Sequence, residues 1–316
     1  MVSRAHCIPN WFQLGTSVEN KLRTAESLGE VAENVARFLG AQVPSNRQLF
    51  NDIITPLSSI GEVVIIGGLV RDLAFYGFEE RPISDIDLVV RGSPSALKRF
   101  AGSIGAIPNK FGGYGLQTDA FKADFWALSS TWARQAGHVK MRSPSDLIRS
   151  TFFDWDAIIY STKNSEVKAI SGYLSRLHSR ILDLNLEPNP SVKGNLVRAL
   201  RRVMMWDARP GPKLRRFILG ALRHHSWDEL RLAEMNAFHT LYLSGFQSAS
   251  EYCVDVLRNP AFHGVGRDDL RQATLFGELP STYHLPEASH VTRLSSLRRI
   301  RRRNRSKTWD LFADQP

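Results

Sequence analysis

The stretch GGLVRDLAFYGFEERPISDIDLVV, residues 67–90, decides the fold of this chain. It follows the apolar run Glu62–Ile66, which reads as a strand, and its two glycines lead into an expected helix. The segment Ile83–Val90 alternates as a second strand does, and this alternation places Asp85 and Asp87 on one face. Strands and helices interspersed in this way indicate an α/β domain.

The residue types in this stretch predict a particular chemistry. Two like charges a few ångström apart repel, so a pair such as Asp85 and Asp87 normally persists where a cation or a strong donor neutralises it, and a pair of oxygen ligands suits Mg²⁺. Gly67 and Gly68 have no Cβ and let a polyphosphate approach the backbone N–H groups, while the start of the next helix adds its positive end. Together these features are the parts of a nucleotidyl-transfer site.

The same block resembles the signature of the DNA polymerase β-like nucleotidyltransferase superfamily, which has a Gly-Gly turn, a helix and an Asp-x-Asp strand. A more specific form, G-G-x-V-R-D, is present as Gly67, Gly68, Val70, Arg71 and Asp72. It resembles the branch of tRNA CCA-adding enzymes and bacterial poly(A) polymerases. The resemblance implies a polymerase β-like palm and places the glycines, the arginine and the aspartate of this motif beside the nucleotide.

The family also requires a third carboxylate from a neighbouring strand. Residues Phe121–Leu128 alternate as a strand after a hairpin turn, and Asp124 takes the third position. Asp119 is the alternative, but it lies in the turn, where a carboxylate usually caps its own backbone. The resemblance implies that Asp85, Asp87 and Asp124 hold two Mg²⁺ ions and catalyse transfer from a nucleoside triphosphate (NTP).

Two further segments resemble this branch less closely. Residues Thr151–Tyr160 resemble its R-R-D-F-T-I-N-A-x-A-Y segment, with Asp156 where the family has asparagine. Residues Asn195–Met205 resemble its arginine-rich neck helix, and Arg198 and Arg201 are expected to face the nucleotide or RNA. The E-D-x-x-R helix that selects C or A in CCA-adding enzymes is missing from the neck region, so base selection is expected to differ.

The sequence pattern predicts four parts. These are an N-terminal helical extension (1–60), a nucleotidyltransferase domain with a mixed sheet and flanking helices (61–170), an all-helical neck and body (171–292) and a basic tail (293–316). The first helix of the all-helical part is expected at Gly172–Leu182, and a helix of the N-terminal extension is expected at Asn46–Ser58.

Composition excludes several classes of protein. The two cysteines, Cys7 and Cys253, are far apart without CxxC spacing, which indicates neither a disulfide framework nor a zinc site. No stretch approaches the ~20 apolar residues of a membrane span, and no secretion signal is evident, so a cytoplasmic protein is expected. The sequence does not indicate the oligomeric state.

The net charge of +10 favours a polyanionic partner. The segment Arg293–Lys307 has eight basic residues and no acidic one. RNA contact is predicted for Arg298, Arg299, Arg301, Arg302 and Arg303. A solvated tail is the alternative interpretation, since blocks of like charge often behave so.

The sequence thus predicts a metal-dependent enzyme that adds nucleotides from an NTP to an RNA 3′ end, with tRNA as the expected acceptor and pyrophosphate as the product. One alternative is a nucleotidyltransferase that modifies a small molecule or a protein, or a toxin or defence effector that acts on tRNA. An RNA-binding module without catalysis is a third hypothesis, and the three carboxylates argue against it.

The basic segment makes a testable prediction. If Arg293–Lys307 binds phosphates, binding releases condensed counterions, so RNA affinity falls steeply with salt concentration. Truncation before Arg293 is expected to weaken RNA binding and to flatten that salt dependence, while nucleotide affinity stays the same. Binding titrations at several salt concentrations measure both. Equal slopes for the two proteins would identify the segment as a solvated tail.

Overall fold

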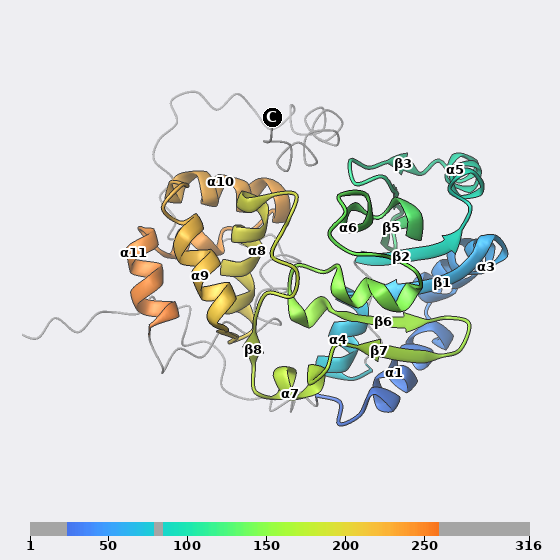
Figure 1. Ribbon diagram of the computed structural model, residues 1–316, viewed down its shortest axis with the longest axis horizontal. Helices are drawn as coiled ribbons and strands as arrows, with labels where there is room; N and C mark the ends of the chain where they lie inside the picture. Colours follow the sequence, from blue (N-terminus) through green and yellow to red (C-terminus); the bar gives the residue numbers. More distant parts are fainter. Residues whose placement is uncertain (1–23, 79–84, 259–316) are drawn as a thin grey trace, which may run out of the picture. The chain divides into compact units, whose positions relative to one another are not determined.

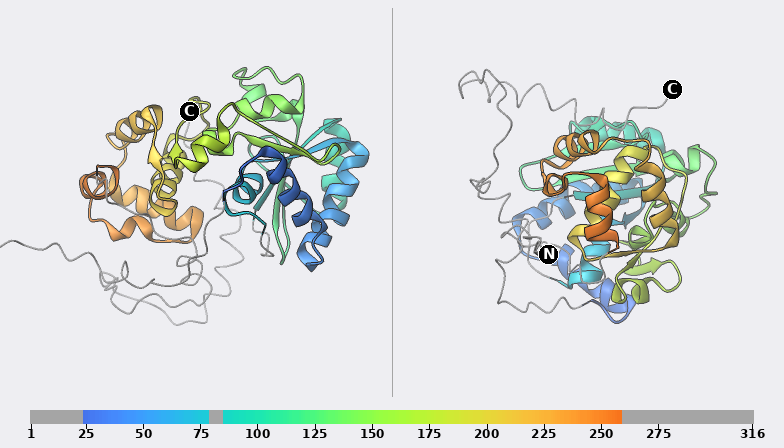
Figure 2. Two further views of the ribbon diagram at one scale, coloured as in Figure 1. Left: turned by 90° about the horizontal axis from the view of Figure 1, so that it is seen from below. Right: turned by 90° about the vertical axis from the view of Figure 1, so that its left-hand side faces the viewer.

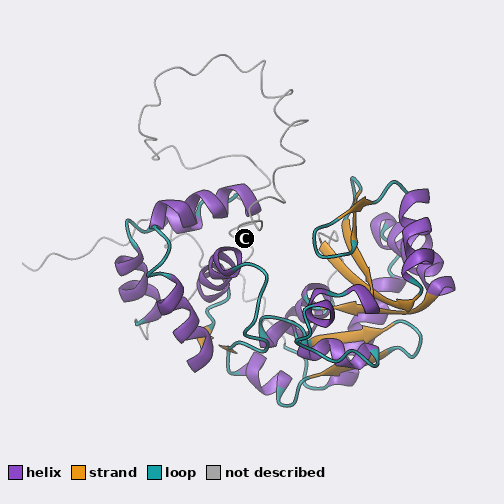
Figure 3. Ribbon diagram, turned by 45° about the horizontal axis from the view of Figure 1, so that its top comes forward, coloured by secondary structure: helices purple, strands orange, loops and turns teal. Residues whose placement is uncertain are grey.

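The computed structural model describes residues 24–78 and 85–258 of the 316-residue chain. These residues belong to two compact units (Figures 1 and 3). The first, here called the sheet unit, lies within residues 22–189 and 211–213. The second, here called the helical unit, contains residues 190–210 and 214 onward.

The sheet unit is built on one mixed, seven-stranded sheet in the order β3-β4-β5-β2-β1-β6-β7. The β2–β5 pair is parallel and the other pairs are antiparallel. The strands are β1 (Gly61–Ile66), β2 (Asp85–Gly92), β3 (Ile107–Pro108), β4 (Tyr114–Gln117), β5 (Lys122–Ala127), β6 (Ile158–Ser161) and β7 (Glu166–Ala169). The mixed sheet with flanking helices that the sequence predicted is therefore confirmed.

Helices cover one face of this sheet (Figure 2). Contacts join α3 and α4 to β1 and β2, α5 to β5, and α1 to α4 and β7. On this face Leu88 of β2 lies beside Phe125 of β5, and the Phe125 ring packs 5.8 Å from that of Phe100 in α5. The helical elements before and around these strands are α1 (Leu28–Gly40), α2 (Pro44–Gln48), η2 (Leu49–Ile54), α3 (Thr55–Ile60), α4 (Gly68–Tyr76) and α5 (Pro94–Ser103).

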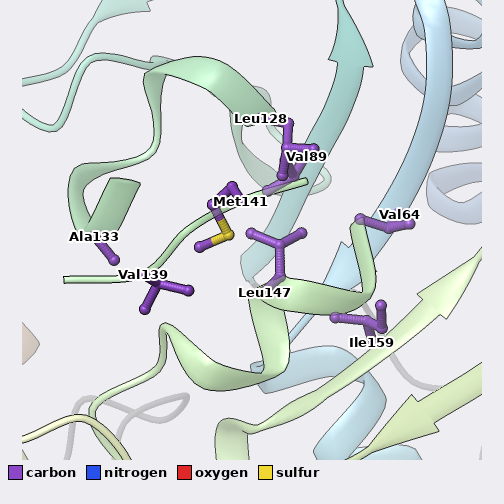
Figure 4. Packing of buried hydrophobic residues seen from close by; sticks show 8 residues of the cluster. All are labelled: Val64, Val89, Leu128, Ala133, Val139, Met141, Leu147 and Ile159. Carbon is purple, nitrogen blue, oxygen red and sulfur yellow. The ribbon is translucent and has the colours of Figure 1, made fainter. Parts of the chain in front are cut away.

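The opposite face is covered in part by the chain that follows β5 (Figure 4). Val64, Val89 and Ile159, from three neighbouring strands, pack there with buried Met141 and Leu147. The covering segment contains η3 (Leu128–Ser130), α6 (Trp132–Gln135) and η4 (Pro144–Arg149), and η5 (Asp154–Asp156), which follows it, contacts α4. Alternation along β2 puts Asp85 and Asp87 on this same face, beyond the apolar cluster.

Two expected helices differ from those observed. The helix expected at Gly172–Leu182 is α7 (Tyr173–His178), and β8 (Ile181–Leu182) follows it. It ends early because Arg180 takes a left-handed φ of 53° and the Ile181 carbonyl accepts a 2.7 Å hydrogen bond from Trp155 Nε1. The helix expected over 46–58 consists of α2, η2 and α3 in succession.

The described part of the helical unit has a core of its own. Its elements are α8 (Val192–Met205), β9 (Arg209–Pro210), α9 (Pro212–Ala221), α10 (Trp227–Phe238), η6 (Tyr242–Gly245), α11 (Ala249–Tyr252) and η7 (Cys253–Leu257). Tyr252 is fully buried and its hydroxyl donates to the Leu200 carbonyl at 2.8 Å. Residues 259–292 of the predicted all-helical part lie outside the described residues.

Gly113 provides a test of the packing around β5. A Cβ at this position would lie 2.2 Å from Trp126 Cδ1 and 2.7 Å from the Phe125 carbonyl oxygen. Gly113→Ala is therefore expected to lower the free energy of unfolding by about 1–3 kcal/mol. Gly102→Ala is the control, because nothing lies within 4 Å of its added Cβ and alanine favours helix α5 by up to about 1 kcal/mol. Urea unfolding measures both; equal stability of the two variants would contradict this packing.

Candidate active site

Asp85, Asp87 and Asp124 come together on one face of two adjacent parallel strands. In the β2–β5 register, Asp87 lies opposite Asp124, and Asp85 lies opposite Lys122. Residues opposite each other in a register share a face, as do residues two apart along a strand. The four side chains therefore form two rows on the sheet face opposite the one that α3, α4 and α5 cover.

The alternative third carboxylate, Asp119, lies in the turn between β4 and β5 and is exposed. The side chain that caps this turn is that of Thr118, whose Oγ1 accepts hydrogen bonds from the Phe121 and Ala120 amides at 2.9 and 3.2 Å. Asp119 does not cap the turn in the way expected from the sequence. Of the two carboxylates, Asp124 is the one placed beside Asp87.

Lys122 supplies a positive charge that the sequence interpretation did not include. Its Nζ lies 3.3 Å from Asp124 Oδ2 and 3.9 Å from Asp85 Oδ1. Asn109 adds a hydrogen bond, since its Nδ2 donates to Asp124 Oδ1 at 3.4 Å. The available signal was position, because Lys122 precedes Asp124 by two residues in a strand and so shares its face.

The carboxylates Asp85 and Asp124 differ in how exposed their side chains are. The Asp85 side chain is 71% exposed, whereas that of Asp124 is 12% exposed. Burial raises the pKa of Asp124 above its usual range, although Lys122 and Asn109 oppose this shift.

The glycine turn lies directly beside these carboxylates. Ile66, the last residue of β1, is the register partner of Asp87, and Gly67 follows it. Gly67 has a left-handed φ of 72°, a conformation that favours glycine, and its amide donates to the Ile158 carbonyl at 3.0 Å. Helix α4 starts at Gly68, so the first turn of α4 presents backbone N–H groups that have no intrahelical acceptor.

Ion pairs of Arg71 support the glycine turn at Gly67 and Gly68. Arg71 is buried, its Nε and Nη2 donate to Asp72 Oδ1 at 3.0 and 2.8 Å, and its Nη1 pairs with Asp156. Asp156 is the residue that stands where the resembled family has asparagine. Its Cβ is 3.8 Å from where a Cβ on Gly67 would lie. Arg71 thus connects α4 to η5 next to the glycine turn.

Asp154, two residues before Asp156 in the chain, is another buried carboxylate. Its Oδ1 accepts from the Asp183 amide at 2.9 Å and its Oδ2 from Arg176 Nη1 at 3.0 Å. Burial raises the pKa of Asp154 to about 6, and the hydrogen bond from Asp183 and the charge of Arg176 only partly offset that effect. These contacts attach η5 to α7 and to the segment after β8.

The donor set fits magnesium in its chemistry, since all three carboxylates supply hard oxygen ligands. In the arrangement described, however, the ammonium of Lys122 contacts two of them. Across residues 24–78 and 85–258, no group of three His, Cys, Asp or Glu side chains is disposed to hold a metal ion.

The neck arginines lie in the helical unit. Arg201 is buried on α8, pairs with fully buried Glu234, and its guanidinium lies 4.3 Å from the centroid of the Phe238 ring. Arg198 is exposed on the same helix. Their contact with a nucleotide or RNA stays a prediction, and the predicted RNA-binding arginines from Arg298 to Arg303 lie outside the described residues.

No protein-family model and no curated protein matches this chain. Solved structures do match it. One is a tRNA nucleotidyltransferase complexed with a primer tRNA and an incoming ATP analogue (22% identity, 54% of this chain and 52% of that one, TM-score 0.39). Another is a Thermotoga maritima CCA-adding enzyme complexed with tRNA (17% identity, 80% of this chain and 57% of that one, TM-score 0.45). A third is a tRNA-processing enzyme with CTP (22% identity, 54% of this chain and 48% of that one, TM-score 0.38).

The resemblance to the polymerase β-like nucleotidyltransferases rests on the glycine turn and the Asp-x-Asp strand of this chain. The chain spans about half of the length of the three solved structures named above, at 48–57%. Their TM-scores are below 0.5, so a function for this chain rests on its own site residues.

Within the residues that the structure describes, no helix is both long enough and apolar enough to span a membrane.

The raised pKa of Asp154 makes a prediction about pH. Because the folded chain holds this proton more tightly than the unfolded chain, with a pKa of about 6 against 3.8, the resulting stabilisation is complete below pH 3.8. It is lost as the pH rises through 6, and the loss is on the order of 3 kcal/mol.

The measurement is urea unfolding of wild type and Asp154→Asn between pH 3.5 and 7. The asparagine variant is expected to lack this part of the pH dependence, whereas Asp52→Asn, at an exposed position of the same unit, is expected to keep it. Identical pH profiles for wild type and Asp154→Asn would show that the pKa of Asp154 is the same in the folded and the unfolded chain.

Proposed function

We propose that this chain is a metal-dependent nucleotidyltransferase that transfers a nucleotide from an NTP to the 3′ end of an RNA, with tRNA as the expected acceptor. The observation that carries the proposal is the register of three strands. Asp87 lies between Ile66 of β1 and Asp124 of β5. The glycine turn that follows Ile66 and the three carboxylates therefore meet at one end of the sheet.

The two halves of this site bind different parts of the substrate. The turn at Gly67 and the first turn of α4 are suited to the triphosphate, because backbone N–H groups and the helix dipole attract its negative charge. Arg71, Asp72 and Asp156 fix the position of this turn through their buried ion pairs. This positioning matters because phosphoryl-type transfer depends mainly on alignment and charge neutralisation.

Asp85, Asp87 and Asp124 would hold Mg²⁺. When bound, the metal ions supply positive charge that favours ionisation of the acceptor hydroxyl and departure of pyrophosphate. Asp124 would also accept the proton of that hydroxyl. The hydroxyl then attacks the α-phosphate, one P–O bond forms, and the bond to pyrophosphate breaks.

The charge of the helical unit supports a polyanionic acceptor. Residues 192–225 contain nine Lys and Arg and a single acidic residue, Asp207. The buried Arg201 is paired with Glu234, and several of the other basic residues of this unit are exposed, among them Arg198, Arg209, Arg215, Arg216 and Arg223. An exposed set of positive charges with few acidic neighbours in sequence is typical of a surface that binds RNA phosphates.

The carboxylates provide the test of this proposal. Asp85→Asn, Asp87→Asn and Asp124→Ala are each expected to reduce nucleotide transfer by orders of magnitude, because each removes an oxygen ligand charge from the metal site. Asp119→Ala is the control and is expected to keep activity, at a cost in stability of about 1 kcal/mol or less.

The assay incubates the pure protein with Mg²⁺, each labelled NTP in turn and total tRNA, and circular dichroism verifies the fold of each variant. Activity of Asp85→Asn equal to wild type would contradict the proposed site. Transfer that depends on the three carboxylates but uses a small molecule or a protein in place of RNA would keep the chemistry and change the acceptor.

A further inference from the structure

Lys122 is the one residue of the four-residue array that is not a carboxylate. It occupies the position opposite Asp85, two residues before Asp124, and its Nζ lies 3.9 Å and 3.3 Å from their carboxylate oxygens. Asp124 is also held by Asn109, whose side chain reaches it from the segment between β3 and β4. A positive charge is thus built into the place where the carboxylates would bind metal.

The position of Lys122 has an electrostatic consequence. An ammonium this close to two carboxylates reduces the negative potential that attracts a divalent cation, and it repels a cation that enters between them. The Lys122 side chain is 31% exposed, and it ends a flexible four-carbon stem with three rotatable donors. The ammonium can therefore leave the carboxylates when another anion comes within reach.

A triphosphate in the proposed site is such an anion. The glycine turn that would bind it begins one residue after Ile66, which lies beside Asp87, and Asp87 lies beside Asp124. Lys122 is two residues from Asp124 on the same face, so phosphate oxygens and the two carboxylates compete for one ammonium.

We propose that Lys122 couples metal binding to triphosphate binding in this site. Without a triphosphate, its ammonium pairs with Asp85 and Asp124 and keeps their affinity for a divalent cation low. With a triphosphate bound, the ammonium turns to the phosphates and releases both carboxylates to the metal. This inference rests on the proposed function and assigns Lys122 as a positioning residue of that site.

The coupling is reciprocal. If the triphosphate raises the affinity for the metal by some factor, the metal raises the affinity for the triphosphate by the same factor. Removal of the ammonium then has two opposite effects. Metal binds more tightly to the free protein, and the gain in metal affinity that a triphosphate produces becomes smaller.

The experiment measures Mn²⁺ binding to the full chain by electron paramagnetic resonance, with and without a non-hydrolysable NTP analogue. For wild type, the analogue is expected to tighten Mn²⁺ binding at least 10-fold. For Lys122→Met, Mn²⁺ binding without the analogue is expected to be about 5- to 10-fold tighter than in wild type, and the effect of the analogue is expected to shrink accordingly.

Three further variants serve as controls. Lys98→Met removes a charge from the exposed surface of α5 and is expected to leave both affinities unchanged. Lys122→Arg keeps the positive charge and is expected to keep the weak metal binding of wild type. Lys122→Gln keeps a polar side chain without the charge, is expected to behave as Lys122→Met does, and replaces it if the methionine variant does not fold.

Asp85→Asn separates failure of this inference from failure of the proposed function. If Asp85→Asn weakens Mn²⁺ binding while Lys122→Met and Lys122→Gln bind Mn²⁺ as wild type does, the coupling role of Lys122 is wrong and the metal site stands. If Asp85→Asn leaves Mn²⁺ binding unchanged, the metal is bound elsewhere, and both the proposed site and the coupling are overturned.

Discussion

The parallel pairing of β2 with β5 is the constraint on which the candidate site depends. It places Asp87 beside Asp124 and Asp85 beside Lys122, although the two strands are more than 30 residues apart in the chain. The helix-covered face fixes this register, because Leu88 and Phe125 are fully buried there. A slip of one residue would move these apolar side chains to the opposite face and bring the carboxylates into the core, so burial on one face determines the arrangement of charges on the other.

The negative charge on that face is partly compensated within the site. Asp124 is largely buried, which favours its neutral form, while Lys122 and Asn109 favour its ionised form. The glycine turn has a similar support, since buried Arg71 pairs with Asp72 and Asp156 beneath it. The buried pairs of Arg71 hold the glycine turn in position, and such preorganisation would lower the cost of binding the nucleotide of the proposed function.

In the helical unit, Arg201 forms an ion pair with a buried carboxylate of the same unit. Arg201 lies on the helix that resembles the arginine-rich neck helix of the tRNA nucleotidyltransferases, yet it pairs with Glu234 and its guanidinium lies over the rings of Phe238 and Tyr242. The Glu234 carboxylate also accepts from the Leu243 amide at 2.8 Å. The contacts of Arg201 thus connect α8 to the end of α10 and to the η6 turn, while Arg198 on the same helix is exposed.

The sequence by itself determined the features that depend on local geometry. Period-two alternation gave the faces of β2 and β5, and the missing Cβ of Gly67 gave the turn, because both act over a few residues. Tertiary structure alone decided which side chains pair: Lys122 with Asp85, Asp156 with Arg71, and Glu234 with Arg201. It also decided that α7 ends at His178, because Trp155 Nε1 donates a hydrogen bond to the carbonyl of Ile181, three residues further on. Each of these partners is distant in the chain and is selected by strand order, register and burial, which no local pattern encodes.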